Sequence, residues 1–180
     1  MATIRANFST LLEYHPYHYE IKSLLSGPVK SISPPCCVQV SYALNHAGCP
    51  IVNQKFWVPM MGRNCRFVKD ARGSLYLIEV CDMTAYLNGM YGVAENYRGS
   101  KEEMRSAIEG RQGIIAFGRA HIDLWEGDRF HQENTANMPD DWAKGSKPVV
   151  VWNRPSVKSM GIFFWEVGLK QQSLHQLIYT

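Results

Sequence analysis

The stretch SPPCCVQVSYALNHAGCP, from Ser33 to Pro50, constrains the fold more than any other part of the chain. Its two prolines end any preceding helix, because proline lacks a backbone N–H and clashes with the preceding turn. Apolar residues then recur at helical spacing, and Gly48 with Pro50 closes the pattern. The stretch therefore predicts a helix from Cys36 to Ala47.

Two thiols, Cys36 and Cys37, stand in the first turn of this predicted helix. A helix N-terminus carries unpaired backbone N–H groups and the positive end of the helix dipole, and both favour a thiolate. A nucleophilic cysteine needs that placement. The alternative is that both cysteines pack in the core as small apolar residues. The helix alone leaves both interpretations open.

Composition narrows the class of protein. A chain of 180 residues with 46% hydrophobic and 19% charged residues is an ordinary globular composition, and we expect one domain spanning residues 1–180. The five cysteines include no CxxC pair, so neither a zinc site nor a redox motif is indicated. The formal net charge of +3 comes without a basic stripe, so nucleic acid is not an expected partner.

The N-terminal sequence MATIRANFSTLLEY lacks the apolar segment of a secretory signal. No apolar run approaches the ~18 residues that a membrane-spanning helix requires. We therefore expect the protein to be made in the cytoplasm and to leave, if at all, by a route without a cleaved signal.

The order of predicted elements indicates an α+β fold. Besides the cysteine-bearing helix, helical patterns start near Phe8, Tyr19 and Asp82, and the SKEE capping box at 100–103 starts another. β-Prone segments cover 56–58, 75–78, 113–117, 121–125, 147–152 and 161–167, whereas 60–64 looks irregular. Helices thus precede an antiparallel sheet.

A cysteine nucleophile needs a base within hydrogen-bond reach, usually histidine. His46 would lie about 15 Å from Cys36 along one helix at ~1.5 Å per residue. His15 and His18 are spaced only loosely like metal ligands and have no third ligand nearby, so we expect a packing or surface role for them. His121 opens a predicted strand, and a cysteine on a helix followed by a histidine on a strand is the papain order. The alternative is a histidine that merely satisfies a strand end.

The segments CCVQVSYALN, YLIEVCDMTAYLNGMYG, GIIAF, HIDLWEG and FFWEV occur in this order between about Cys36 and Val167. In this order they resemble the type VI secretion amidase effectors of family 4, which are similar to NlpC-type papain-like peptidases. The resemblance implies a papain-like (NlpC-type) fold, in which the nucleophile-bearing helix packs on an antiparallel sheet. It also implies an enzyme that needs no metal or cofactor.

The resemblance further implies a biological role. Such an effector would pass through the type VI secretion machinery into the periplasm of a rival bacterium. There it would hydrolyse the peptidoglycan stem peptide between D-glutamate and meso-diaminopimelate, and a cognate immunity protein would protect the producer.

The resemblance also assigns the site. The family nucleophile lies six residues before the tyrosine of SYALN, which selects Cys36 and leaves Cys37 as a packing residue. The base is His121, the first residue of HIDLW, and Asp123 in that motif is expected to be structural. Cys36 thiolate would attack the amide carbonyl, and N–H groups at the helix start would stabilise the oxyanion.

Two departures from the family pattern stand near His121. Ala120 replaces the usual glycine before the histidine, with Gly118 two residues earlier. The position of the family's aspartate, about eleven residues after the histidine, holds Gln132. Gln132 is the expected third catalytic residue, because an amide carbonyl can orient an imidazole. Three neighbours remain alternatives: His131, Glu133 and Asn134.

Two other functions remain open. A housekeeping cell-wall endopeptidase would share the chemistry, but a signal peptide or a wall-binding repeat would be expected. A catalytically inactive wall-binding or interaction protein would share the fold, and the altered third position favours it. Three side chains are candidates for binding substrate carboxylates, although no pattern selects among them: Tyr42, Arg63 and Arg119.

Overall fold

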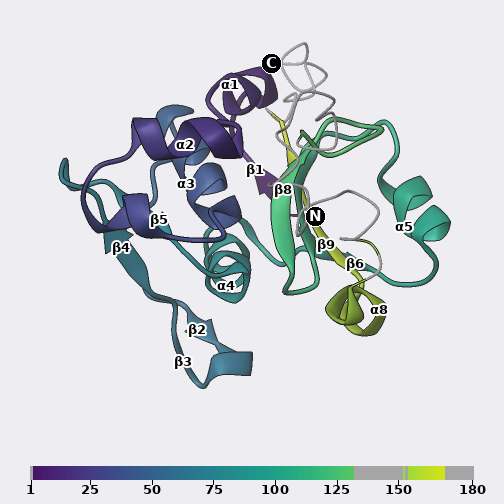
Figure 1. The fold of residues 1–180 in the computed structure, drawn as a ribbon. Coiled ribbons are helices and arrows are strands. Elements are labelled where there is room, and N and C mark those ends of the chain that lie inside the picture. The colour runs from purple at the N-terminus through teal and green to yellow at the C-terminus, as the bar shows by residue number, and fades with distance from the viewer. Residues whose placement is uncertain (1, 132–151, 153, 169–180) are drawn as a thin grey trace, which may run out of the picture.

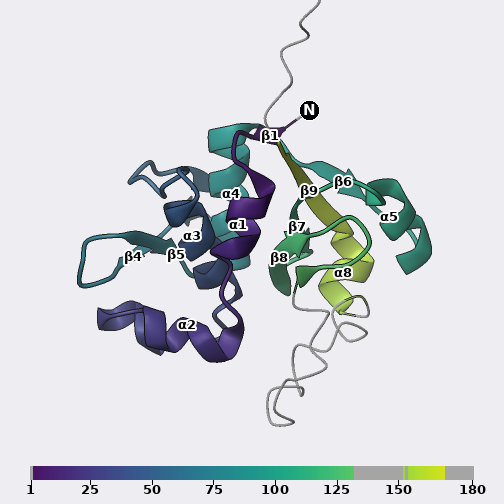
Figure 2. The same cartoon turned by 90° about the horizontal axis from the view of Figure 1, so that it is seen from above.

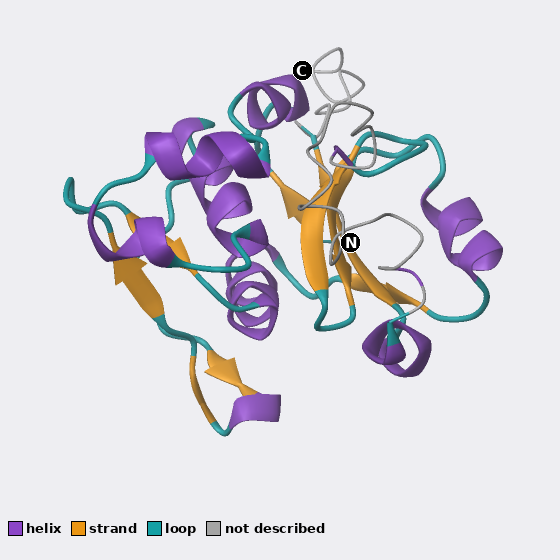
Figure 3. Cartoon of the chain, viewed as in Figure 1, coloured by secondary structure: helices purple, strands orange, loops and turns teal. Residues whose placement is uncertain are grey.

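The computed structural model describes residues 2–131, 152 and 154–168. Its helices are α1 (Phe8–Glu13), α2 (His18–Leu24), the 3-10 turn η1 (Gly27–Ser31), α3 (Cys36–His46), η2 (Pro59–Met61), α4 (Val80–Tyr91), α5 (Lys101–Ile108) and α8 (Pro155–Met160). Its strands are β1 (Thr3–Ile4), β2 (Trp57–Val58), β3 (Arg63–Asn64), β4 (Phe67–Lys69), β5 (Leu75–Leu77), β6 (Glu95–Tyr97), β7 (Gly113–Phe117), β8 (His121–Trp125) and β9 (Ile162–Val167). The predicted α+β class is confirmed (Figure 3).

The main sheet has the order β1-β9-β7-β8. β6 pairs with the same side of β9 as β1 does, but at the start of β9, whereas β1 pairs with its end. The pairs β9–β7, β7–β8 and β6–β9 are antiparallel, while β1 runs parallel to β9. β8 forms an edge of the sheet, and its first residue, His121, pairs with Phe117 at the end of β7. The remaining described strands form two antiparallel hairpins outside this sheet, β2–β3 and β4–β5.

Helices cover the sheet on two sides. Helices α1, α3 and α4 lie on one side, and α5 and α8 lie on the other (Figures 1 and 2). β7 is buried on both faces: Ile114 and Ala116 join the core beneath α3 and α4, whereas Ile115 and Phe117 join the core beneath α5 and α8. This explains why GIIAF is continuously apolar instead of alternating.

Helix α3 begins at Cys36 as predicted and ends at His46, one residue before the predicted end. Pro35 occupies the N-cap position and provides no capping side chain. The helix packs against α1, β5 and the edge strand β8. Its first turn is therefore brought to the sheet edge where β8 begins.

The β7–β8 turn depends on Gly118. This residue has a φ of 53°, and a Cβ atom there would lie 2.6 Å from the carbonyl oxygen of Ser156. Its N–H donates to Gly161 O at 3.0 Å. The turn thus requires glycine at position 118. It does not require glycine at position 120, where the N–H of Ala120 donates to Phe117 O at 2.9 Å.

Several elements differ from the sequence prediction. The 60–64 segment, predicted to be irregular, contains part of η2 and strand β3. β1 and β6 were not predicted, because both are short and form by pairing with β9. Helix α8 was also missed, and it begins at Pro155, a residue favoured at the first helical position.

Other predictions are confirmed. Helix α5 has the predicted capping box, in which Ser100 and Glu103 cap each other's backbone N–H. β9 falls within the predicted segment 161–167, whereas most of the predicted strand at 147–152 lies outside the described residues. In the described part of the chain, no helix is long and apolar enough to cross a membrane.

Candidate active site

The structure brings Cys36 and His121 together, although they lie far apart in the sequence. Cys36 is the first residue of α3 and His121 is the first residue of β8. The thiol and the imidazole are hydrogen-bonded to each other; Cys36 is buried, and the side chain of His121 is 12% exposed. The ring of His121 also packs against Phe117 and Phe130, with ring centroids 6.1 and 6.0 Å apart. These two aromatic contacts restrict the position of the imidazole.

The surroundings of Cys36 favour its thiolate. Its pKa is held well below the ordinary value, first by a hydrogen bond from Cys37 and then by the hydrogen bond and charge of His121, against desolvation, which raises it. The backbone N–H of Ile122 also hydrogen-bonds the sulfur. Ile122 belongs to the edge strand β8. An edge strand has N–H groups with no partner strand, so this donor is available to Cys36.

Cys37 has the opposite chemistry. It is 1% exposed, and burial, the hydrogen bond with Cys36 and the charges of Cys36 and Asp82 raise its pKa well above the ordinary value. Cys37 thus stays a protonated thiol that donates to Cys36. The sequence predicted only a packing role for Cys37, and the structure adds this hydrogen bond.

His121 is strongly favoured in its protonated form. Burial lowers its pKa, but the hydrogen bonds with Asp123 and Cys36, with their charges, outweigh burial and raise it to about 10. The Nε2 atom lies 3.4 Å from Oδ2 of Asp123. At neutral pH, Cys36 is therefore a thiolate, His121 an imidazolium and Asp123 a carboxylate, and His121 lies between the other two.

Asp123 is completely buried. Burial raises its pKa, but the hydrogen bond with His121 and the nearby His15, His121 and His131 bring the pKa below the ordinary value. Its Oδ1 atom accepts a hydrogen bond from Leu124 N at 2.8 Å. The sequence predicted that Asp123 shares a strand face with His121 but gave it a structural role. The contact with His121 Nε2 was not predicted.

A second buried histidine, His15, approaches Asp123 from the loop after α1. Its Nε2 atom lies 3.5 Å from Asp123 Oδ1, and its side chain is completely buried. The loop is held by Gln39 of α3, a buried residue whose Nε2 donates to Pro16 O at 2.8 Å. The packing or surface role expected for His15 did not include this position beside the site, and no sequence pattern indicates it.

The predicted third residue, Gln132, lies outside the described residues, and so do the alternatives Glu133 and Asn134. His131, the remaining alternative, is described. Its Nδ1 atom lies 2.9 Å from Glu126 Oε1, and its ring stacks on Tyr17 and meets His15 edge-on at a centroid distance of 5.3 Å. Within the described residues, Nε2 of His121 has Asp123 as its partner.

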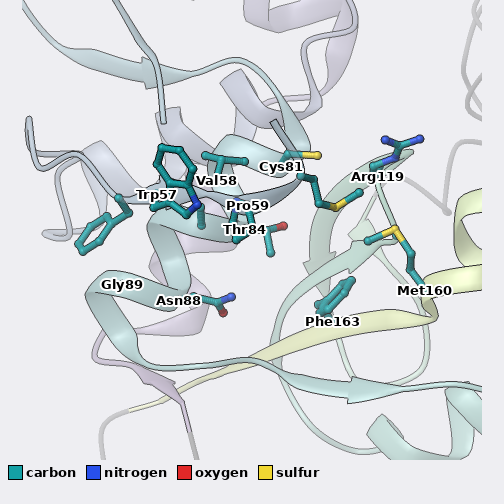
Figure 4. Close-up of a pocket in the computed structure, with 14 residues that line it drawn as sticks. Trp57, Val58, Pro59, Cys81, Thr84, Asn88, Gly89, Arg119, Met160 and Phe163 are labelled. Atoms are coloured by element: carbon teal, nitrogen blue, oxygen red, sulfur yellow. The ribbon is translucent and has the colours of Figure 1, made fainter. Parts of the chain in front are cut away.

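An apolar cavity of about 520 Å³ lies beside the site, bounded by the β2–η2 segment, α4, the β7–β8 turn and β9. Cys36 and His121 do not line it, but Arg119, two residues before His121, does. Figure 4 shows Trp57 and Arg119 on opposite sides of the cavity. The cavity therefore reaches the turn that directly precedes His121.

The three candidate carboxylate binders differ in their surroundings. Arg63 pairs with the buried Asp82 at 2.5 Å and with Glu79 at 2.9 Å, so two carboxylates of the protein already neutralise its charge. The ring of Tyr42 stacks on His46 with centroids 4.1 Å apart. Arg119 is exposed at the cavity wall, and no ion pair of its guanidinium occurs within the described residues. Arg119 is thus the best placed of the three to meet an anionic ligand.

Among residues 2–131, 152 and 154–168, no group of three or more His, Cys, Asp or Glu side chains could hold a metal ion.

Comparison with known proteins identifies a family. Residues 33–165 match the family model Tae4, described as type VI secretion system (T6SS) amidase effector protein 4. That segment contains Cys36, His121 and Asp123. No curated protein matches the sequence.

Solved structures of similar fold include the effector Tae4 from Salmonella typhimurium in complex with the immunity protein Tai4 from Enterobacter cloacae. It has 22% sequence identity and a TM-score of 0.64, and the alignment covers 91% of this chain and 100% of the other. The Tae4–Tai4 complex from Enterobacter cloacae has 19% identity and a TM-score of 0.63, with coverage of 92% and 100%. Tae4 from Enterobacter cloacae has 20% identity and a TM-score of 0.60, with coverage of 93% and 100%. At these identities the likeness shows a shared fold.

Because the family model matches most of the chain, with the paired cysteine and histidine inside the matched segment, this protein belongs to the type VI secretion system amidase effector 4 (Tae4) family.

Proposed function

We propose that this chain is an antibacterial effector with a papain-like (NlpC-type) fold, a cysteine amidase that cleaves the peptidoglycan stem peptide between D-glutamate and meso-diaminopimelate. The observation that carries the proposal is the hydrogen-bonded pair of Cys36 and His121 at a helix N-terminus. Family membership supplies the amidase class, and the pair supplies chemistry that can cleave an amide.

In the first half of the reaction, Cys36 Sγ attacks the amide carbonyl carbon and forms a carbon–sulfur bond. The N–H groups in the first turn of α3 stabilise the oxyanion, because Pro35 provides no side chain that competes for them. His121 gives its proton to the amide nitrogen, the carbon–nitrogen bond breaks, and the amine leaves. A thioester remains on Cys36.

In the second half, neutral His121 takes a proton from water, and the hydroxide attacks the thioester. The carbon–sulfur bond breaks, the carboxylic acid product leaves, and the thiolate–imidazolium pair is restored. These steps need no group other than the two side chains, the helix N–H groups and water.

Asp123 is the group that we propose to orient His121. Because Nε2 of the imidazole faces Asp123 Oδ2 at 3.4 Å, Nδ1 is the nitrogen left for the thiol and the leaving amine. A buried carboxylate in this place fixes the ring and stabilises the imidazolium. Gln132 stays a prediction for a further polar contact, since it lies outside the described residues.

Arg119 is the residue that we propose to receive a carboxylate of the stem peptide. It stands at the cavity wall beside the β7–β8 turn, where a bound peptide would pass His121. A guanidinium matches a carboxylate in charge and in the geometry of two parallel hydrogen bonds.

The proposal includes delivery by the type VI machinery to the periplasm of a rival cell, and a cognate immunity protein that covers the site. Solved complexes of Tae4 with Tai4 support the immunity partner. A thiol whose surroundings favour the thiolate supports an active enzyme over an inactive wall-binding protein.

The test is digestion of isolated sacculi with purified protein, with the released fragments identified by mass spectrometry. Wild type is expected to release peptides that begin with meso-diaminopimelate, leaving stems that end in D-glutamate on the glycan, whereas Cys36→Ala releases none. Cleavage at another bond would refute the assignment of the bond. Equal release by wild type and Cys36→Ala would refute the assignment of the nucleophile.

A further inference from the structure

His15 is a buried imidazole that the proposed reaction does not use. Its side chain has no solvent exposure, and neither ring nitrogen makes a hydrogen bond within the described residues. Leaving a buried polar group without a partner destabilises the folded state. Such a group in a folded protein calls for a physical reason. For His15 the nearest charged atom is Oδ1 of Asp123, at 3.5 Å.

Asp123 stands between two imidazoles. Its Oδ2 atom faces His121 Nε2 at 3.4 Å, and its Oδ1 atom faces His15 Nε2 at 3.5 Å. The contacts come from different elements: His121 shares strand β8 with Asp123, while His15 arrives from the loop after α1. An imidazole therefore faces each oxygen of the carboxylate. Asp123 contacts His121, which in turn contacts Cys36.

The loop that carries His15 is fixed to the helix that carries the cysteine. Gln39 lies one turn beyond Cys36 in α3 and donates to Pro16 O at 2.8 Å. On its other side, His15 meets the ring of His131 edge-on, and His131 is tied to Glu126 at 2.9 Å. His15 has little freedom to move away from Asp123.

We propose that His15 is a positioning residue for the catalytic site, in which its Nε2–H is directed at Oδ1 of Asp123 and keeps Oδ2 aligned with His121. This rests on the proposed function. The neutral Nε2–H tautomer is the one that suits this place, since a lone pair on Nε2 would face the negative carboxylate. Burial keeps His15 neutral, lowering its pKa to about 4, so His15 polarises Asp123 without removing its charge from His121.

The physical effect passes through Asp123 to the thiolate. Among the described residues, the titratable groups that act on Asp123 are His121 from its own strand, His15 from the α1 loop, and His131 from the segment after β8. Without the N–H of His15, the buried carboxylate loses a stabilising partner and can rotate away from His121. The imidazolium is then held less firmly, and Cys36 forms its thiolate at higher pH.

The experiment compares His15→Leu, which removes the N–H, with His15→Gln, whose amide N–H can reach the same carboxylate. The readout is the pH dependence of the alkylation of Cys36 by iodoacetamide, followed by mass spectrometry of the peptide that contains Cys36. This reaction needs no peptidoglycan, so it reports on the thiolate whether or not the proposed amidase activity is correct. His46→Leu is the matched control, because His46 is an exposed histidine of α3 that bonds to Tyr42 O at 2.8 Å.

His15→Leu is expected to move the midpoint of alkylation about one pH unit upward, equivalent to about a tenfold slower reaction on the acid side. It is also expected to lower kcat on stem peptide about tenfold with little change in KM. His15→Gln and His46→Leu should stay within about twofold of wild type. An unchanged midpoint in His15→Leu, or equal shifts in His15→Leu and His15→Gln, would overturn the proposal. Absence of amidase activity in wild type with a shifted midpoint in His15→Leu would overturn only the proposed function.

Discussion

The Nε2 atom of His121 lies 3.4 Å from Oδ2 of Asp123, two residues along the same strand. Because successive side chains of a strand point to opposite faces, residues two apart share a face and their side chains can meet. The carboxylate of Asp123 is completely buried, and the imidazole, 12% exposed, packs beside the rings of Phe117 and Phe130. This local contact decides which nitrogen of His121 is left for Cys36, and the first prediction follows from it.

Asp123→Asn should lower amidase activity by about 10³–10⁴, because an amide in place of the carboxylate no longer stabilises the imidazolium. In wild type the thiolate–imidazolium pair persists until the pH approaches about 10, where His121 loses its proton. Without the charge of Asp123 the pKa of His121 falls, so the alkaline limb of the pH–rate profile moves to lower pH. Stem-peptide hydrolysis measured from pH 5 to 10 tests this. Asp128→Asn, in an exposed turn, is the control and should leave the profile in place.

Cys37→Ala is expected to retain most of the activity at high pH and to lose part of it at low pH. The hydrogen bond from Cys37 is the largest contribution that lowers the pKa of Cys36, so its removal raises the pH at which the thiolate forms. Cys37→Ser, which keeps an O–H donor, should restore the low-pH activity. Loss of all activity in Cys37→Ala, with the fold intact by circular dichroism, would contradict the choice of Cys36 as nucleophile.

His15 should make the fold sensitive to acid. The unfolded chain protonates this imidazole near pH 6.5, whereas the folded protein does so only near pH 4 because the ring is buried. The unfolded state therefore binds more protons between these values, and stability is lost as the pH falls from 6.5 through 4. Between pH 7 and pH 5 this single group should cost about 2 kcal/mol. Urea unfolding at both pH values should show a loss that is smaller in His15→Gln by that amount. Equal losses in the two proteins would show that His15 is not buried as a neutral ring.

The buried Asp82 predicts a large difference between two neighbouring arginines. Arg63 pairs with Asp82 at 2.5 Å, whereas Arg66 is about half exposed and approaches Asp82 only to 3.9 Å. Removing the partner of a buried charge typically costs about 3–5 kcal/mol, while an exposed pair contributes less than about 1 kcal/mol.

Arg63→Met should therefore lower the free energy of unfolding clearly more than Arg66→Met does, because it leaves the buried carboxylate of Asp82 with only the more distant Arg66. Arg66→Met is the matched control and should cost less than about 1 kcal/mol. Chemical denaturation of both variants measures the difference. Similar losses would show that the two arginines share the charge of Asp82 equally.

Arg119→Gln should weaken substrate binding more than it slows chemistry. If Arg119 binds a free carboxylate of the stem peptide, its loss should raise KM about tenfold on a peptide with free carboxylates. The same variant should behave like wild type on a peptide in which those carboxylates are amidated. Arg119→Lys keeps the charge but not the paired N–H geometry, so its KM on the peptide with free carboxylates should lie between those of wild type and Arg119→Gln. A tenfold loss on both peptides would exclude charge recognition by this residue.

Much of the local structure follows from short stretches of sequence. The prolines before Cys36 and the apolar spacing after it predict the start of α3 correctly, and the capping box at Ser100 predicts the start of α5. The apolar run GIIAF and the alternating HIDLW predict β7 and β8. These features are local, because capping, helical periodicity and strand alternation each involve residues that are close in the chain.

The short strands and the site environment were harder to predict. β1 and β6 exist because they pair with β9, which comes much later in the chain. The strand period placed Asp123 on the same face as His121, but it did not predict the contact between them or the approach of His15, since it says which residues share a face and not which buried groups meet there. Nothing near His15 in the sequence indicates that it would approach β8.

The sequence alone determined that a thiol opens a helix, that a histidine opens a later strand, and that the family motifs stand in order around both. Tertiary structure decided how the two are used. The packing of α3 on β8 supplies the hydrogen bonds from His121 and Ile122 to Cys36, and the bond from Gln39 to Pro16 brings His15 to Asp123. These contacts join distant segments, and their strength depends on burial, which no local pattern specifies.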